Sequence, residues 1–122
     1  MGYKIYSDAK GKLVYTERLL ELEIAELPGT LVEINSLLES SSISRVLVDG
    51  TALKPPIHKG DIYSCMSDFL SRLQPGTRIA CLVSDHITDD VLEFKQTLAD
   101  NMGLVFRNFR QEEEARNWLE ED

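Results

Sequence analysis

Long apolar runs and basic residues are both scarce in this sequence. No stretch approaches the ~18 consecutive apolar residues that a membrane-spanning helix needs, and the first residues lack the apolar run and cleavage site of a secretory signal. These absences predict a cytoplasmic protein without a membrane span. Thirteen basic residues stand against 21 acidic ones, for a formal net charge of −8. Because that charge repels phosphate backbones, we expect no nucleic-acid partner.

Cofactor-binding and hydrolase motifs are also missing. The chain contains no GxGxxG, Walker A or GxSxG pattern, which are the commonest signatures of nucleotide-dependent enzymes and serine hydrolases. Its two cysteines, Cys65 and Cys81, have no CxxC or Cys/His neighbour at metal-ligand spacing. We interpret both as reduced core residues, since free cysteine is among the most buried residue types. The sequence therefore predicts no cofactor and no enzymatic activity.

Strand and helix patterns alternate along what remains, an ordinary globular composition. With 122 residues, the chain is long enough for one core and too short for two, so we treat 1–122 as a single domain. Residues 17–27 fit both a strand and a helix, and we favour a continuation of the preceding strand. The other predicted elements are strands at 3–7, 12–16, 45–49, 77–83 and 104–109, and helices at 28–39, 62–73, 89–102 and 111–121.

Capping residues and apolar faces predict how the helices begin and pack. Asp61 and Thr88 stand where they can cap the second and third helices. Three helices carry apolar residues at helical spacing. In the helix at 62–73 these are Ile62, Cys65, Met66, Phe69, Leu70 and Leu73, and in the helix at 89–102 they are Val91, Phe94, Leu98 and Met102. In the helix at 111–121 they are Ala115, Trp118 and Leu119, opposite Glu112, Glu113 and Glu120. We interpret these faces as core. The first of them could instead line a pocket for an apolar ligand.

The elements follow the order ββαβαβαβα, which predicts an α/β fold. Strand–helix alternation with short connections favours parallel neighbours, so we expect a mostly parallel central sheet with an N-terminal antiparallel hairpin and flanking helices. Residues 46–51 form an apolar strand that ends in an aspartate and a small polar residue. Residues 105–119 form a strand followed by a helix of the pattern EEA..WL. In this order and spacing the chain resembles the STAS domain family, within its uncharacterised SpoIIAA-like branch.

The resemblance implies a non-enzymatic regulatory or protein-interaction module. Family members of the sporulation type are phosphorylation-controlled switches, with the acceptor serine in a D-S-S-G-like turn that starts the helix after the Asp-ended strand. The corresponding stretch here, 57–64, reads IHKGDIYS. Asp61 stands roughly where the hydroxyl should be, and could hold a permanently charged version of the switch. Ser64 comes one turn later, and we interpret it as a solvated helix residue rather than a phosphoacceptor.

Polar residues gather where the predicted strands end. Ligands of open α/β sheets bind beyond the carboxyl ends of the strands. This rule selects Asp49, Thr51, Ser84, Asp85 and His86, together with His58 on the neighbouring loop. Two histidines and two aspartates could bind a metal or act as acid and base. Alternatively, the aspartates cap loops and the histidines lie in surface turns. Without an HxH or HExxH frame we favour the second interpretation and predict no metal site.

Three functions are open, and the resemblance implies the first of them. The first is a module that binds a protein partner through the loop 50–61, which includes two prolines at 55–56, and through the helix after it. The second is a carrier or sensor of a small apolar or anionic ligand in a pocket under that loop. The third and weakest is an enzyme that uses the two histidines and two aspartates at the strand ends. The sequence leaves homodimerisation open.

Overall fold

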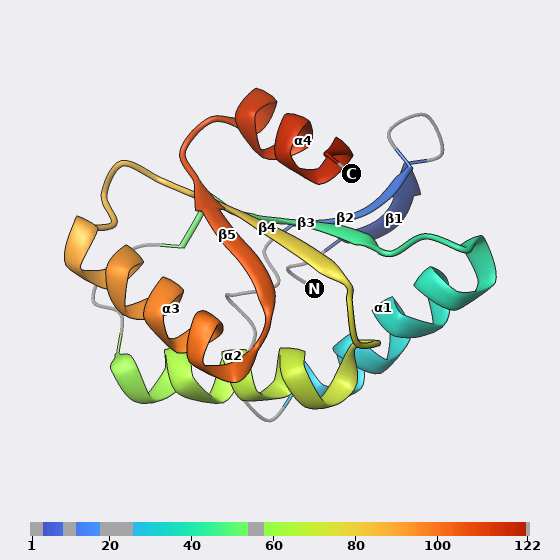
Figure 1. The fold of residues 1–122 in the computed structure, drawn as a ribbon, viewed down its shortest axis with the longest axis horizontal. Helices are drawn as coiled ribbons and strands as arrows, with labels where there is room; N and C mark the ends of the chain where they lie inside the picture. Colours follow the sequence, from blue (N-terminus) through green and yellow to red (C-terminus); the bar gives the residue numbers. More distant parts are fainter. Residues whose placement is uncertain (1–3, 9–11, 18–25, 54–57, 122) are drawn as a thin grey trace.

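Five strands form one sheet with helices on both of its faces, as the computed structural model in Figure 1 shows. The structure describes residues 4–8, 12–17, 26–53 and 58–121. The strands follow one another across the sheet in chain order: β1 (Lys4–Asp8), β2 (Leu13–Glu17), β3 (Arg45–Gly50), β4 (Arg78–Val83) and β5 (Val105–Phe109). β1 and β2 are antiparallel and every other pair is parallel. The predicted α/β class, element order and mixed sheet are confirmed.

Four helices connect and close this sheet: α1 (Leu27–Ser41), α2 (Lys59–Arg72), α3 (Asp89–Met102) and α4 (Glu112–Glu120). Pro28 lies in the first turn of α1, as predicted, and Gly103 ends α3 at φ 78°, a left-handed conformation that glycine adopts without strain. The predicted caps are less accurate. Thr88 stands at the N-cap of α3 but its side chain makes no capping bond. α2 begins at Lys59 with His58 at its N-cap, so Asp61 lies inside the first turn and is not the cap.

The sheet separates two apolar cores of different size. On one face, α1, α2 and α3 cover a large core that includes Val46, Val48 and Ile79. On the other face α4, the only described helix there, covers a smaller core, in which Leu119 and Ala115 pack against Leu47. Alternate residues of β3 face opposite cores, as the pleat of a strand requires. The predicted role of α4 as an amphipathic helix docked on the sheet is confirmed.

Two predicted apolar faces differ from the structure. Leu70, expected in the core, is 48% exposed on α2. In α3 the predicted apolar residues are only partly buried against the core, and the buried residues are Lys95 and Ala99. Sequence periodicity identifies apolar side chains at helical spacing, but the neighbours that cover a helix decide which of its residues become buried. The burial of Lys95 differs more from the sequence pattern than the exposure of Leu70 does.

A side chain covers part of the β5 edge. The Gln96 Nε2 atom, from α3, donates to the Phe106 carbonyl oxygen at 2.8 Å. β5 is the last strand in the sheet order, so one side of its backbone has no neighbouring strand among the residues that the structure describes. An unpaired edge is a template for pairing with another chain. Gln96 therefore satisfies a backbone group that strand addition would need.

Some predicted features lie outside the described residues or change their bounds. Residues 9–11 of the predicted hairpin, residues 18–25 of the ambiguous stretch 17–27 and the prolines at 55–56 lie outside them. At the ends of that stretch, Glu17 belongs to β2 as favoured, but Leu27 begins α1 and is not part of a strand. The predicted loop at 50–61 is shorter than expected, since Gly50 belongs to β3 and α2 begins at Lys59. Over the ranges that the structure describes, no helix is long and apolar enough to cross a membrane.

Candidate functional site

The predicted site residues lie around the carboxyl end of the parallel strands, but in separate groups. Asp49 is near the end of β3, and Asp85 and His86 form the turn after β4. His58 and Asp61 lie at the start of α2. Among the hydrogen bonds and ion pairs between described residues, none joins the His58 or Asp61 side chain to the other predicted residues. The shared sheet edge therefore holds two local networks rather than one convergent cluster.

The first network is centred on the Asp49 carboxylate. Its Oδ2 atom accepts a hydrogen bond from the Tyr15 hydroxyl at 2.7 Å. Its Oδ1 atom accepts two more, from the Thr51 backbone N–H at 3.0 Å and from the Thr51 hydroxyl at 2.6 Å. An aspartate that accepts from the backbone two residues later forms an Asx turn. Asp49 therefore fixes the direction in which the chain leaves β3, and the interpretation of this residue as a loop cap is supported.

These bonds also set the charge state of the pair. Partial burial opposes ionisation of Asp49, but hydrogen bonds from Thr51 and Tyr15 outweigh burial and lower the pKa of Asp49. The pKa of Tyr15 is raised by three effects: its burial, its hydrogen bond to Asp49 and the negative charge of that carboxylate. The pair is thus held as an ionised acceptor and a neutral donor. A tyrosine with a raised pKa is a poor general base, so this pair suits fixation of the chain better than proton transfer.

Aromatic and charged side chains extend this network across β1 and α4. The Tyr6 and Tyr15 rings stack with their centroids 5.2 Å apart. Arg116, from α4, lies 5.9 Å from the Tyr15 ring and forms ion pairs with Asp8 at 3.2 Å and Glu112 at 2.7 Å. The hydrogen bond to Glu112, partly offset by burial and supported by Asp8, raises the pKa of Arg116. Arg116 thereby ties α4 to the first hairpin.

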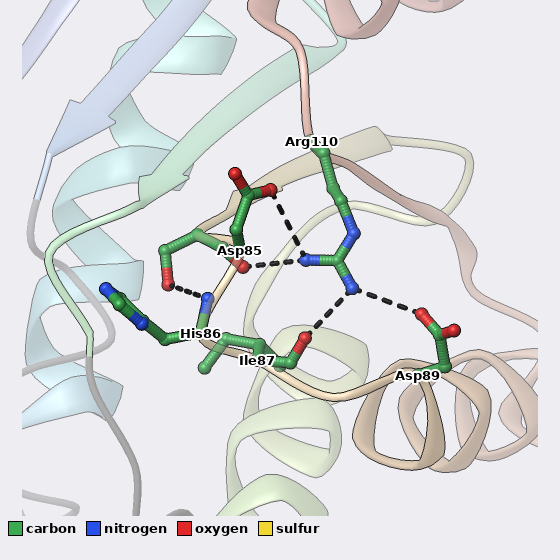
Figure 2. Close-up of polar contacts among 6 residues, drawn as sticks. Asp85, His86, Ile87, Asp89 and Arg110 are labelled. Carbon is green, nitrogen blue, oxygen red and sulfur yellow. Dashed lines mark hydrogen bonds and ion pairs between the residues drawn. The ribbon is translucent and has the colours of Figure 1, made fainter.

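The second network is centred on Arg110, which follows β5. Figure 2 shows its guanidinium group reaching into the turn between β4 and α3. The Nη1 atom donates to the Ser84 carbonyl oxygen at 2.7 Å, and the Nη2 atom donates to the Ile87 carbonyl oxygen at 2.9 Å. The planar fork of arginine suits such paired contacts. Arg110 therefore closes the turn that carries Asp85 and His86.

Acidic side chains complete the Arg110 contacts from the surface. Asp89 lies 3.2 Å from the Nη2 atom and Asp85 lies 4.0 Å from the Nη1 atom. Their side chains are 92% and 94% exposed, so both ion pairs are well solvated. The His86 side chain points away from the guanidinium group (Figure 2), while its backbone N–H donates to the Ser84 hydroxyl at 3.3 Å. As the surface interpretation expected, His86 is exposed in a turn and His58 is exposed at a helix cap.

The chemical capacity of this edge follows from these contacts. Within the described ranges, no three His, Cys, Asp or Glu side chains lie close enough together to hold a metal ion. Asp49 is partly buried, and both of its carboxylate oxygens accept hydrogen bonds from within the protein. Ser64, the alternative phosphoacceptor, is the sixth residue of α2 and partly buried, so it does not begin the helix. The edge is organised to hold loops in place.

Three important residues escaped the sequence analysis. Tyr15 and Arg116 were hidden because neither belongs to a motif, and their contacts depend on how β2 and α4 meet in space. A weak signal existed for Arg110, since it comes directly after a strand whose carboxyl end faces the turn after β4. Strand-end reasoning selected Asp85 and His86 there and passed over Arg110, which pairs with Asp85 and donates to two carbonyl groups of the same turn.

A shallow groove lies at the opposite end of the sheet. It runs between the end of α2 and the loops that lead into β4 and β5, and its apolar lining includes Leu70, Leu73, Leu104 and Val105. The segment 50–61 follows the carboxyl end of β3, so this groove is not the pocket predicted under that segment. It adds exposed apolar surface next to α2.

Comparison with known proteins found no match: no family model, no curated protein and no solved structure corresponds to this chain. The resemblance to STAS domains therefore stays a prediction, made from residues 46–51 and 105–119 and from the order of the elements. The function has to be inferred from the geometry of the chain itself.

Proposed function

We propose that the protein is a STAS-like regulatory module that binds a protein partner through residues 50–61 and the exposed face of α2. The observation that carries this proposal is a pair of large apolar side chains on that helix. Tyr63 is 56% exposed and Leu70 is 48% exposed. Seven residues apart, they project from the same side of the helix. Aromatic and aliphatic anchors of this kind dominate the binding energy of protein interfaces.

Neighbouring features support a contact surface at this place. Leu70 also lines the groove at the end of α2, so the apolar stripe of Tyr63 and Leu70 continues into a concavity. At the other end of the stripe, the exposed Asp61 places a negative charge in the first turn of α2. The start of the 50–61 segment is held by the Asx turn of Asp49 and by a hydrogen bond from the Leu53 N–H to the Gly50 carbonyl oxygen. A fixed entry and an apolar helix face lower the cost of ordering on binding.

The polar networks favour binding over chemistry as the role of this end of the molecule. Asp49 and Arg110 are occupied by internal bonds that fix the two neighbouring loops. Catalytic groups are instead aimed at a substrate position. We therefore propose no reaction for the two histidines and two aspartates at the strand ends.

Site-specific photo-crosslinking in the cells that make this protein tests the proposal. A photoreactive amino acid replaces Tyr63, and in a matched control it replaces Tyr6, which is 47% exposed on β1. We expect a discrete crosslinked partner from position 63 and none from position 6. Leu70→Glu should abolish the adduct, because a charge in the apolar stripe opposes burial. Equal adducts at both positions, or an adduct that survives Leu70→Glu, would contradict the proposed face.

A further inference from the structure

Beneath α3, a lysine and a cysteine meet in the protein interior. Lys95 is 6% exposed and Cys81, on β4, is 2% exposed. The Lys95 Nζ atom lies 3.6 Å from the Cys81 Sγ atom and 5.6 Å from the centre of the Phe106 ring. Among the ion pairs between described residues, none joins Lys95 to a carboxylate. Buried ammonium groups are normally paired with acids, so stability alone does not explain this arrangement.

A second polar group beside Cys81 also has unused bonding capacity. Asn108, on β5, is the register partner of Cys81 on β4, so the two side chains project from the same face of the sheet. Its Oδ1 atom is buried and has no hydrogen-bond partner in the part of the chain that the structure describes. Buried amide oxygens are seldom left without a partner. The surroundings of Cys81 therefore offer both an amine and a free acceptor.

Cys65 lies in the same core but differs in character. Burial raises the pKa of Cys65 to about 12, although the charge of Lys95 acts in the opposite direction. Its thiol therefore stays protonated, and a protonated thiol is a weak nucleophile. The hydrogen bond from Lys95 goes to Cys81 and not to Cys65. One core thus holds an inert cysteine and a cysteine in contact with an amine.

We propose that Cys81 and Lys95 form a redox pair that hydrogen peroxide converts into a sulfur–nitrogen cross-link. In the first step the Cys81 sulfur attacks one peroxide oxygen, the O–O bond breaks, and the leaving hydroxide takes the thiol proton, so that sulfenic acid and water form. Sulfur is oxidised by two electrons and peroxide is reduced. In the second step the Lys95 nitrogen gives up a proton to water, its lone pair attacks that sulfur, and the hydroxyl group leaves with a second proton from the nitrogen as water. Condensation of sulfenic acids with nitrogen nucleophiles is established chemistry for cysteine.

The geometry supports each step. The amine already contacts the sulfur that it attacks, and the buried, unpartnered Asn108 Oδ1 atom belongs to the register partner of Cys81 on the neighbouring strand. Peroxide is scarcely larger than water and needs no cleft. α3 buries only Lys95 and Ala99 fully, so local opening of this helix exposes the pair more readily than opening of a better-buried element. Two equivalents of an external thiol reverse the reaction by restoring the cysteine and the amine as they form a disulfide.

Peptide mapping of the whole, folded protein tests this proposal without any mutation. The protein is treated with hydrogen peroxide, quenched, denatured with a thiol-blocking reagent and digested with trypsin. Cleavage after Arg78 and Lys95 normally releases peptide 79–95, which holds both residues. A bonded Lys95 blocks cleavage, so we expect peptide 79–107 with two hydrogen atoms fewer than its reduced form, and its loss after dithiothreitol. Cys65 lies in the separate peptide 60–72 and should stay unmodified, as an internal control.

Other products would overturn the proposal. One such outcome is normal release of peptide 79–95, with Cys81 either unmodified or present as a stable sulfenic or sulfinic acid. Another is a disulfide between peptides 60–72 and 79–95. A third is a peptide 79–107 that also contains an extra oxygen atom. Lys95→Arg keeps the positive charge but should abolish the cross-link and leave Cys81 to oxidise further. Cys65→Ser should leave the yield of the cross-link unchanged. Circular dichroism checks the fold of each variant, and the result on the unmutated protein stands if a variant does not fold.

Discussion

The polar groups at the carboxyl end of the sheet have hydrogen-bond partners, whereas those in the interior beneath α3 have few. At the sheet end, Asp49 accepts three hydrogen bonds and Arg110 donates to two backbone carbonyl groups. Beneath α3, the Lys95 amine contacts a thiol and a ring, and the Asn108 oxygen has no partner among the described residues. The first region uses its polar groups to hold loops. The second holds polar groups at a cost in stability, which suggests a role other than folding.

The largest effect should come from Arg110→Ala. Two carbonyl groups would lose charge-assisted hydrogen bonds, and we expect the free energy of unfolding to fall by about 2 to 4 kcal/mol. Urea unfolding followed by circular dichroism measures this change. Arg107→Ala, at an exposed position on β5, is the control and should change stability little. If the two variants were equally stable, Arg110 would not hold the turn between β4 and α3.

The interior should respond in the opposite direction. Lys95→Met keeps the length of the side chain and removes a buried amine without a carboxylate partner, so we expect the free energy of unfolding to rise by about 1 to 2 kcal/mol. The same denaturation measurement applies. Lys59→Met, at an exposed residue of α2, should have a near-neutral effect. A loss of stability in Lys95→Met would mean that the amine stabilises the fold, and the contrast between the two regions would fail.

A smaller effect with a defined pH dependence is expected for Tyr15→Phe. The variant loses one hydrogen bond to a carboxylate, and we expect a loss of about 1 kcal/mol at pH 7. The pKa of Asp49 is lower in the folded protein than its ordinary value, so the stabilisation is present above that ordinary value and is lost as the pH falls through the folded value.

Unfolding at pH 7 and at about pH 3, below the ordinary aspartate pKa, tests this dependence. The difference between wild type and Tyr15→Phe should shrink on acidification. In an Asp49→Asn background, the Tyr15→Phe change should be smaller and independent of pH over this range. A pH-independent difference in the wild-type background would show that the ionised carboxylate does not contribute.

The smallest effect should come from Asp85→Asn. This side chain is 94% exposed and lies 4.0 Å from Arg110, so we expect a change below about 0.5 kcal/mol. The free energy of unfolding of wild type and variant, measured at low and at high salt, should be nearly the same at each salt concentration. A loss comparable to that of Arg110→Ala would mean that surface charge, and not the two carbonyl bonds, holds the guanidinium group.

Sequence patterns predicted the fold well because its determinants are local. Apolar periodicity located the helices, and the near-continuous apolar run of Val46, Leu47 and Val48 located a strand covered on both faces. The prediction of burial failed where a polar residue interrupts the apolar face of a helix. A lysine within an amphipathic helix is assigned to the solvent by any rule based on polarity, and Lys95 is buried instead.

The candidate site was predictable only in part. The position of Asp49 and Asp85 follows from the ends of β3 and β4. Their partners do not, because Tyr15 and Arg110 are 34 and about 25 residues away in the chain and meet them only through the pairing of strands. The exposure of Leu70 was likewise unpredictable, since it depends on what α1 and α3 leave uncovered.

The single tryptophan gives α4 an optical reporter. Trp118 is the only residue of its type in the chain, and it lies on α4, which among the described elements is the one helix on its face of the sheet. The Arg78 guanidinium group lies 4.3 Å from its ring centre, and the Phe109 ring lies 5.7 Å away. Emission from this indole therefore depends on contacts that end when α4 leaves the sheet. Fluorescence can follow the detachment of this one helix while circular dichroism follows the rest of the molecule.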